Sequence, residues 1–440
     1  MSRVRRTTEL GLLILGVLIV GGTYTLASLA RTSSLPANIG PFLGMVFVLL
    51  VVAHVGVRKL ARDADGLLLP LAGLLNGLGY VFIARSNQHL AGLQATWTAL
   101  GIGAFLVTLL VIRRVRDLDR YRYTFALAAI LLLLLPLAPV IGRDINGARI
   151  WVSLGPLNFQ PGEPAKVVLA LFLAGYLVEH RELLGLSTLR IGPVMLPDPK
   201  HMGPLLIAWG MSIVIMVSQN DLGSSLLFFT LFIVLVWVAT ERAAYLAIGL
   251  ALFAGGAAIS YELFGHVRDR VTTWLNPWPV AQTSGYQVIQ GAFAMANGGI
   301  TGTGPGLGDP SRIPARETDF IFAVIGEELG LLGGVAVLTA FLLLVGCGLR
   351  IALRAESTFE KLLATGLSTL LGFQAFVIIG GVIRVLPLTG VTLPFVSFGG
   401  SSLLANYVIL ALLVRISDET GRRARERAEV AAPAVGAGVA

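Results

Sequence analysis

The chain has 440 residues, of which 55% are hydrophobic and only 13% are charged, and its mean hydropathy is +0.81. Soluble domains carry about a quarter charged residues, so this composition excludes an ordinary soluble protein. The net charge of +8 does not indicate nucleic-acid binding. An unequal distribution of basic residues between the loops of a membrane protein explains it better.

Apolar stretches of about 20 residues recur along the chain, each long enough to cross a bilayer core of about 30 Å. They predict an all-α polytopic membrane protein with about twelve transmembrane helices. The first stretch, in MSRVRRTTELGLLILGVLIV, resembles a signal peptide. Its apolar part continues to about Ala30 without a cleavage pattern, so we interpret it as a retained helix. The predicted spans are 9–30, 39–57, 66–84, 93–112, 124–142, 164–180, 203–218, 222–240, 243–264, 320–349, 363–383 and 402–416.

The basic residues predict the orientation of these spans. Most of the 33 Lys and Arg residues fall on alternate connections, which include both termini, and the positive-inside rule places these in the cytoplasm. Other arginines remain on the outer side, where this rule would deplete them. Because guanidinium groups bind phosphate oxygens, they indicate an anionic ligand there. They are Arg143, Arg149, Arg268, Arg270, Arg312, Arg316 and Arg384.

One outer connection, about residues 265–319, is much longer than the others. Loops of this length without structure of their own are uncommon and usually functional. Its stretch YQVIQGAFAMA has apolar residues at helical spacing and predicts a short helix on the membrane surface. Its glycine run, residues 298–308, fits either a hinge or a backbone cradle for phosphate. The run lacks the lysine and Ser/Thr of a nucleotide-binding P-loop.

Asp319 follows Arg312, Arg316 and Thr318 at the outer end of the span 320–349. One interpretation is a helix N-cap, a position at which aspartate is favoured. The other is a general base, because burial beside lipid and protein raises the pKa of a carboxylate toward the useful range, although nearby arginines lower it. The two roles are compatible, and the surroundings of Asp319 favour a role beyond capping.

Two further stretches carry ionisable residues near the outer ends of other spans. Glu163 and Lys166 lie three residues apart and share a helix face, so they form either a structural ion pair or part of a functional site. Asp221 stands in a short outer turn. It either caps the following helix or belongs to the site.

Two more stretches complete the candidate set. Glu327 and Glu328 lie about two turns inside the span 320–349, and at least one must face the interior of the bundle. Residues 386–402, LPLTGVTLPFVSFGGSS, are too rich in Pro, Gly and Ser for a plain loop. Irregular backbone at membrane depth is tolerated only against protein or a wet cavity, so Ser397 and Ser401 are candidates to line one.

These motifs occur in the order of a known family. The stretches NGARIWVSLG, FQPGEPAK, DLGSS, GYQVIQG, RETDFIFAVIGEELG and LPLTGVTLPFVSFGGSSL resemble the signatures of the SEDS family, which includes RodA and FtsW. The resemblance covers about residues 140–410 and is closer to RodA-type members. The chain departs from the family pattern at Gly162, Asn220 and Phe398, where the family has Ser, Pro and Tyr; none of these removes a titratable group.

The resemblance implies a peptidoglycan glycosyltransferase that polymerises lipid II at the outer face of the bacterial cytoplasmic membrane. It implies that Asp319 is catalytic, and that Glu163 and Lys166 face a central cavity. A divalent cation, Mg²⁺ or Mn²⁺, would stabilise the departing pyrophosphate, but no metal ligand can be named. The implied partner is a class B penicillin-binding protein, a transpeptidase. The other candidate substrate residues are Arg268, Arg270, Arg149, Arg316, Asp221, Glu327, Ser397 and Ser401.

The family core has about ten spans, so the chain divides into three parts. Residues 1–62 form an extra N-terminal helix pair, residues 63–418 form the membrane core with the loop 265–319, and residues 419–440 form a cytoplasmic tail that we expect to be disordered. A lipid II flippase or transporter is the alternative function, with a scaffold for the transpeptidase as a third. Transporters usually contain repeats and midplane sites, whereas no repeat is visible here.

Overall fold

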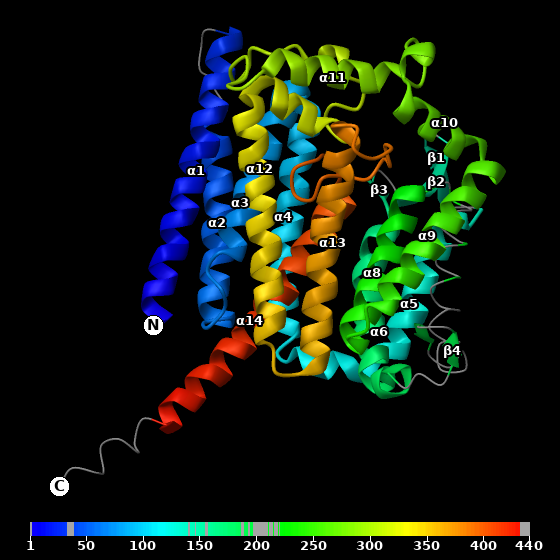
Figure 1. The fold of residues 1–440 in the computed structure, drawn as a ribbon. Coiled ribbons are helices and arrows are strands. Elements are labelled where there is room, and N and C mark those ends of the chain that lie inside the picture. Colours follow the sequence, from blue (N-terminus) through cyan, green and yellow to red (C-terminus); the bar gives the residue numbers. More distant parts are fainter. Residues whose placement is uncertain are drawn as a thin grey trace.

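The structure, a computed structural model, describes residues 2–32, 39–139, 141–145, 147–154, 157–185, 189–191, 194–196, 210, 214, 219 and 221–431. These residues form a bundle of long helices (Figure 1). The helices are α1 (Ser2–Thr32), α2 (Ile39–Leu60), α3 (Leu68–Ser86), α4 (Gln88–Val111), α5 (Arg122–Leu134), α6 (Gly162–Gly185), α8 (Leu222–Thr240), α9 (Ala244–Leu263), α10 (Gly265–Leu275), α11 (Tyr286–Gly298), α12 (Ile321–Arg354), α13 (Thr358–Val382) and α14 (Gly400–Ala431), with 3-10 turns at Val115–Tyr121, Leu135–Leu137, Trp278–Val280 and Pro310–Arg312.

Within the described ranges, nine helices are long and apolar enough to cross a membrane. They coincide with nine of the predicted spans. The predicted spans 39–57 and 164–180 are helices α2 and α6, and 203–218 lies outside the described residues, so the number twelve is not confirmed. The helices also expose large apolar side chains: Leu250 and Leu263 of α9 are both 70% exposed. Such a surface fits lipid and not water.

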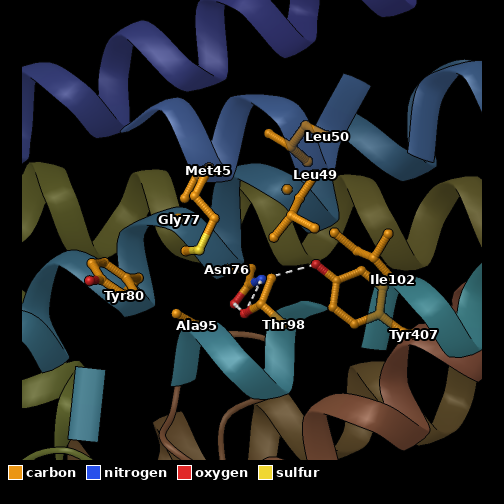
Figure 2. Close-up of a pocket in the computed structure, with 12 residues that line it drawn as sticks. Met45, Leu49, Leu50, Asn76, Gly77, Tyr80, Ala95, Thr98, Ile102 and Tyr407 are labelled. Atoms are coloured by element: carbon orange, nitrogen blue, oxygen red, sulfur yellow. Dashed lines mark hydrogen bonds between the residues drawn. The ribbon is translucent and has the colours of Figure 1, made fainter. Parts of the chain in front are cut away.

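The core of the bundle is formed by α13 and α14, with α14 packed along α4, and α12 along α13 (Figure 1). A polar contact joins α3, α4 and α14 (Figure 2). The Asn76 amide donates hydrogen bonds to the Tyr407 hydroxyl at 2.9 Å and to the Thr98 hydroxyl at 3.1 Å. The adjoining cavity is about 20 Å³, which is room for a single water molecule. This contact therefore holds α3, α4 and α14 together inside an apolar environment.

The residues of the long connection 265–319 lie across one end of the bundle, which we name the α11 end (Figure 1). The predicted surface helix is confirmed as α11. Helix α10 was not predicted, because its sequence GHVRDRVTTWL has few apolar residues. Helix α11 packs against α12, and the N-terminus of α12 begins directly beneath it.

Short strands were not expected in this all-α protein. Strands β1 (Gly142–Ile145), β2 (Ala148–Leu154) and β3 (Leu157–Phe159) form an antiparallel sheet in the order β1-β2-β3, and β4 (Leu189–Ile191) pairs with β5 (Val194–Leu196). Gly147, with φ of 78°, turns the first hairpin, and its N–H donates to the Asp144 carboxylate at 2.9 Å. These segments are too short for sequence periodicity to reveal them.

Helix α14 continues to Ala431, through residues that we expected to be disordered. Ion pairs bind this extension to the connection between α12 and α13 and to the first turn of α13. Arg423 donates two hydrogen bonds to Glu360, each at 2.9 Å, and Arg427 pairs with Glu356 at 2.9 Å. A planar guanidinium fork matches a carboxylate well, so these pairs order residues whose composition alone suggests a flexible tail. Residues 432–440 lie outside the described residues.

Candidate active site

Asp319 is the second residue before α12, and its neighbours are fixed to the connection between α13 and α14. The Ser397 hydroxyl donates a hydrogen bond to the Thr318 carbonyl oxygen at 2.6 Å. The backbone N–H of Phe398 donates to the Glu317 carbonyl oxygen at 2.8 Å. The segment RETDF is thereby held at the α11 end by a partner far away in the chain.

The structure does not support the N-cap interpretation of Asp319. The N-cap of α12 is Phe320, and no side chain caps the helix there. The Asp319 carboxylate instead lines a cavity of about 290 Å³ between α10, α11, the end of α13 and the following loop. Other residues that line this cavity are Asp269, Arg270, Thr273, Trp274, Ser284, Gln287 and Arg384.

Arg270 of α10 faces Asp319 at one position of the cavity wall, Gly390. The Asp319 Oδ2 and the Arg270 Nη2 each lie 3.9 Å from the place that a Cβ on Gly390 would take. Gly390 has φ of 77°, which favours glycine, so the backbone can pass close to both groups. Arg270 is held in place because its Nη1 donates to the Leu388 carbonyl oxygen at 3.2 Å.

The electrostatics of this pair suit proton transfer. Burial raises the pKa of Asp319 from 3.8 to about 6, and the Arg270 guanidinium and a hydrogen bond from Thr318 oppose part of this rise. Burial also lowers the pKa of Arg270, against the effect of Asp221 and Asp319. A carboxylate with a pKa of about 6 is mostly ionised at neutral pH and still basic enough to accept a proton in a transition state.

Glu163 and Lys166 form a buried ion pair behind this cavity. The Lys166 Nζ lies 2.8 Å from the Glu163 carboxylate and donates to the Gln374 side-chain oxygen at 2.9 Å. Gln374 in turn donates to the Thr392 carbonyl oxygen at 2.8 Å. This polar chain connects α6, through α13, to the loop that carries Gly390. Neither ionisable side chain lines the cavity of about 290 Å³ itself.

Asp221 caps α8, as one of the two interpretations predicted. Its carboxylate accepts a hydrogen bond from the Ser224 N–H at 3.0 Å. Burial raises the pKa of Asp221, an effect that the Ser224 contact opposes. Asp221 interacts electrostatically with Glu163, Lys166 and Arg270, so it lies near both the buried ion pair and a residue that lines the cavity.

Three predicted arginines do not line the cavity. Arg268 is exposed and points toward Glu262, with its guanidinium 5.6 Å from the centre of the Tyr261 ring. Arg149 lies on β2, where its backbone N–H donates to the Gln219 carbonyl oxygen. Arg316 binds Glu317 at 3.1 Å and the Ser86 hydroxyl. Arg316 therefore joins the Asp319 segment to α3 instead of facing the cavity.

Glu327 and Glu328 bind the glycine run. Glu327 accepts a hydrogen bond from the Asp309 N–H at 3.2 Å, and Glu328 accepts one from the Gly306 N–H at 2.6 Å. Glu328 also forms a buried ion pair with Arg85, which donates to the carbonyl oxygens of Gly306 and Gly308. The glycine run is thus a fixed element and not a free hinge, and Glu327 does not line the cavity.

Ser397 and Ser401 are both buried and bind backbone. Ser397 supports the residue before Asp319, as described above, and also accepts from the Leu393 N–H at 2.9 Å. The Ser401 hydroxyl accepts from the Gln160 N–H at 2.9 Å. Both serines therefore position the backbone around the cavity. Neither of them lines it.

Arg384 and Trp274 also line the cavity. Trp274 was not predicted, and Arg384 was named only as one of the outer arginines that indicate an anionic ligand. Each donates to the other's backbone: the Trp274 Nε1 to the Arg384 carbonyl oxygen at 2.9 Å, and the Arg384 Nη2 to the Trp274 carbonyl oxygen at 2.9 Å. Arg384 has φ of 61°, unusual for a residue other than glycine. An arginine at the outer end of an apolar helix was the sequence signal for this residue.

Comparison with known proteins decides the family. The family model described as "Cell cycle protein", for FtsW, RodA and SpoVE, matches residues 77–422. The chain belongs to this family. It is the SEDS family that the motifs resembled, and the match includes every candidate residue of the cavity.

Members of the FtsW/RodA/SpoVE family with high similarity are named as enzymes. The chain is 41% identical to the peptidoglycan glycosyltransferase RodA of Mycobacterium tuberculosis (strain ATCC 25618 / H37Rv) over 99% of its length and 95% of that protein. It is 42% identical to RodA of Mycobacterium leprae (strain TN), over 89% of its length and 86% of that protein. The probable peptidoglycan glycosyltransferase FtsW of Geobacter metallireducens is 35% identical, over 77% of this chain and 85% of that protein.

Solved structures of the family share the fold. The crystal structure of the Thermus thermophilus rod shape determining protein RodA has a TM-score of 0.58 at 29% identity, over 80% of this chain and 96% of that one. A structure described as "Structural coordination of polymerization and crosslinking by a peptidoglycan synthase complex" has a TM-score of 0.67 at 30% identity, over 81% of this chain and 98% of that one. The predicted multi-pass helical membrane protein is thus confirmed.

Proposed function

We propose that this FtsW/RodA/SpoVE family member is a peptidoglycan glycosyltransferase that polymerises lipid II into glycan strands and releases undecaprenyl pyrophosphate, for cell elongation. The names of its RodA relatives support the activity. The observation that carries the mechanism is that Asp319 and Arg270 both approach Gly390, in the cavity at the α11 end. A base and a cation beside one another suit a glycosyl transfer to a hydroxyl.

In this mechanism the 4-hydroxyl oxygen of the acceptor sugar attacks the anomeric carbon of the donor. The bond from that carbon to the diphosphate oxygen breaks, with inversion, and the diphosphate departs with the bonding electrons. Asp319 accepts the hydroxyl proton, which contributes about 10²–10⁴-fold. Arg270 and Arg384 stabilise the charge on the diphosphate, because a guanidinium group aligns two donors with phosphate oxygens.

We place the α11 end outside the cytoplasm, together with the active site, and both termini inside. The basic residues support this orientation. Arg58 and Lys59 lie in the last turn of α2, Arg354 in the last turn of α12, and several arginines on the extension of α14, all at the end opposite to α11 (Figure 1). The positive-inside rule assigns such an end to the cytoplasm.

We propose a class B penicillin-binding protein as the partner, because one structural relative belongs to a complex described as coordinating polymerization and crosslinking. Copurification with such a transpeptidase tests this; its absence from purified complexes would contradict it. For a divalent cation, the described residues contain no group of three or more His, Cys, Asp or Glu that could hold one. We propose that any Mg²⁺ or Mn²⁺ enters together with the substrate diphosphate, and we expect calorimetry of the protein without substrate to show no Mn²⁺ binding.

The test of the catalytic proposal is Asp319→Asn in the purified full chain, assayed for lipid II polymerisation in detergent. We expect a loss of about 10²–10⁴-fold, because asparagine cannot accept the proton. The matched control is Asp309→Asn, in the same connection but exposed and paired with Ser311 and Arg312. It should keep full activity.

The detergent assay also separates the proposal from the flippase alternative. Detergent micelles have no two sides, so only a polymerase produces glycan there. Near-normal glycan synthesis by Asp319→Asn would remove Asp319 from the mechanism. No synthesis by the wild-type chain, alone or with its partner, combined with lipid II translocation in vesicles, would favour flipping instead.

A further inference from the structure

A second cavity lies at the end of the bundle opposite to α11, far from Asp319. Its volume is about 370 Å³, larger than that of the candidate active site. The connection between α2 and α3, the end of α12 and the extension of α14 form its walls. We name it the distal pocket and define it by its charged residues Arg62, Asp63, Asp65, Arg350, Arg354 and Arg425.

The distal pocket has more positive than negative charge, and its carboxylates are already paired. Asp63 binds Arg425 at 3.0 Å, and Asp65 binds Arg350. Arg354 is exposed and forms no ion pair or hydrogen bond with any residue that the structure describes. The guanidinium group of Arg354 therefore remains for an anion with several oxygens, beside the paired guanidinium groups of Arg350 and Arg425.

The pocket is built by close backbone packing and not by chance contact of surface side chains. The Asp63 N–H donates to the Asp418 carboxylate at 2.8 Å, and the Asp65 N–H donates to the Ser417 hydroxyl at 2.9 Å. A Cβ on Gly421 would stand 2.4 Å from the Asp63 carbonyl oxygen, so the connection packs directly on α14. These contacts fix the walls before any ligand binds.

The outer surface of α12 indicates that the ligand is a lipid. Leu349 and Leu353 are 40% and 82% exposed. They lie one helical turn apart on α12, and each directly precedes an arginine of the pocket, Arg350 or Arg354. Leu342, further along the helix, is 65% exposed. A phosphate group in the distal pocket would therefore have an apolar track beside it for acyl chains. A soluble phosphate compound would make no use of this track.

We propose that the distal pocket binds the headgroup phosphate of an anionic phospholipid, with the acyl chains along α12. Basic pockets between helices at a membrane surface bind such headgroups. The bound lipid joins the end of α12 to the extension of α14, which the ion pairs with Asp63 and Asp65 already bring together. The proposal does not depend on the glycosyltransferase reaction.

The test uses the purified full chain in detergent with a photoactivatable phosphatidylglycerol, and with the matching phosphatidylcholine for comparison. We expect phosphatidylglycerol to label peptides from the end of α12 or from residues 417–428, in preference to phosphatidylcholine. Arg354→Gln should reduce this labelling about fivefold, since one cationic contact with an anionic lipid contributes about that factor. Arg354→Glu should abolish it. Arg354 has no partner in the described structure, so neither change should impair folding.

Arg113→Gln is the control, because Arg113 is exposed at the same end and outside the pocket. It should label as the wild type does, and so should Asp319→Asn. Equal labelling of Arg354→Gln, Arg354→Glu and Arg113→Gln would overturn the proposal. Equal labelling by the two lipids would also overturn it. So would competition by inorganic pyrophosphate that is as effective as competition by unlabelled phosphatidylglycerol, because this result would indicate a soluble phosphate ligand.

Discussion

At the scale of the residue, Asp319 and Arg270 show what a sequence can and cannot reveal. An aspartate beside an apolar run is visible in the sequence, because an ionisable group at a membrane edge is costly unless it has a use. The choice between Arg268 and Arg270 was not visible. They lie two residues apart on α10, and the rotation of that helix places one in the cavity and the other against Tyr261.

The pKa of Asp319 predicts the pH dependence of catalysis. The carboxyl group must be ionised to act as a base, and its pKa is raised to about 6. Activity should therefore be full above neutral pH. Below the pKa of about 6 it should fall about tenfold for each pH unit. The measurement is kcat/KM for lipid II polymerisation between pH 5 and 8, with the range checked for stability. A profile that stays flat down to a pH near 4 would contradict the assignment.

The two arginines of α10 supply a matched pair of variants. Arg270→Gln should reduce polymerisation by about 10²-fold, because a donor to the departing diphosphate is lost. It should also raise the kinetic pKa of Asp319, since the guanidinium lowers it. Arg268→Gln should stay within about twofold of the wild type, because its ion pair with Glu262 is exposed. Similar losses in both variants would indicate a general effect of charge at this end.

At the scale of the element, the glycine run packs closely against α12. Gly302 and Gly330 both have positive φ, of 84° and 65°. A Cβ on Gly330 would stand 2.2 Å from the Gly302 nitrogen, so only glycine permits this contact. The sequence suggested a hinge because glycine is conformationally free. In the folded chain the same freedom lets the loop lie against α12, where Glu328 and Arg85 hold it.

The buried pair of Arg85 and Glu328 should be costly to break. Arg85→Met or Glu328→Gln alone leaves the other group without its partner and should destabilise the protein by about 3–5 kcal/mol. The double variant should be destabilised by clearly less than the two single effects together. Thermal unfolding of the four proteins in detergent gives this comparison. Strict additivity would mean that the two side chains do not stabilise each other.

At the scale of the whole molecule, the two ends of the bundle carry different groups. The cavity with Asp319 lies at the α11 end, and the basic ends of α2, α12 and α14 lie at the other (Figure 1). The proposed substrate must reach the first end from outside the cytoplasm. The whole assignment therefore depends on which end faces which compartment.

Cysteine labelling in intact cells measures this orientation. Cys347 is the single cysteine and is buried, so a Cys347→Ser background accepts new reporters. A membrane-impermeant maleimide should label Ser311→Cys in intact cells from which any outer barrier has been removed, because Ser311 is exposed at the α11 end. Ala424→Cys, exposed on the extension of α14, should be labelled only after lysis. The reverse pattern would place the cavity in the cytoplasm and exclude the proposed reaction.

The sequence by itself determined the membrane class, most of the spans and helix α11, and it singled out Asp319, Glu163 and Lys166 as candidate site residues. These follow from local properties: the length of apolar runs, helical spacing and the cost of a charge beside lipid. Only the tertiary structure decided which arginines face Asp319, that Glu327 and Glu328 hold a loop, and that residues 419–431 are helical. Each of these depends on contacts between residues far apart in the chain, and such contacts leave no periodic pattern in either partner.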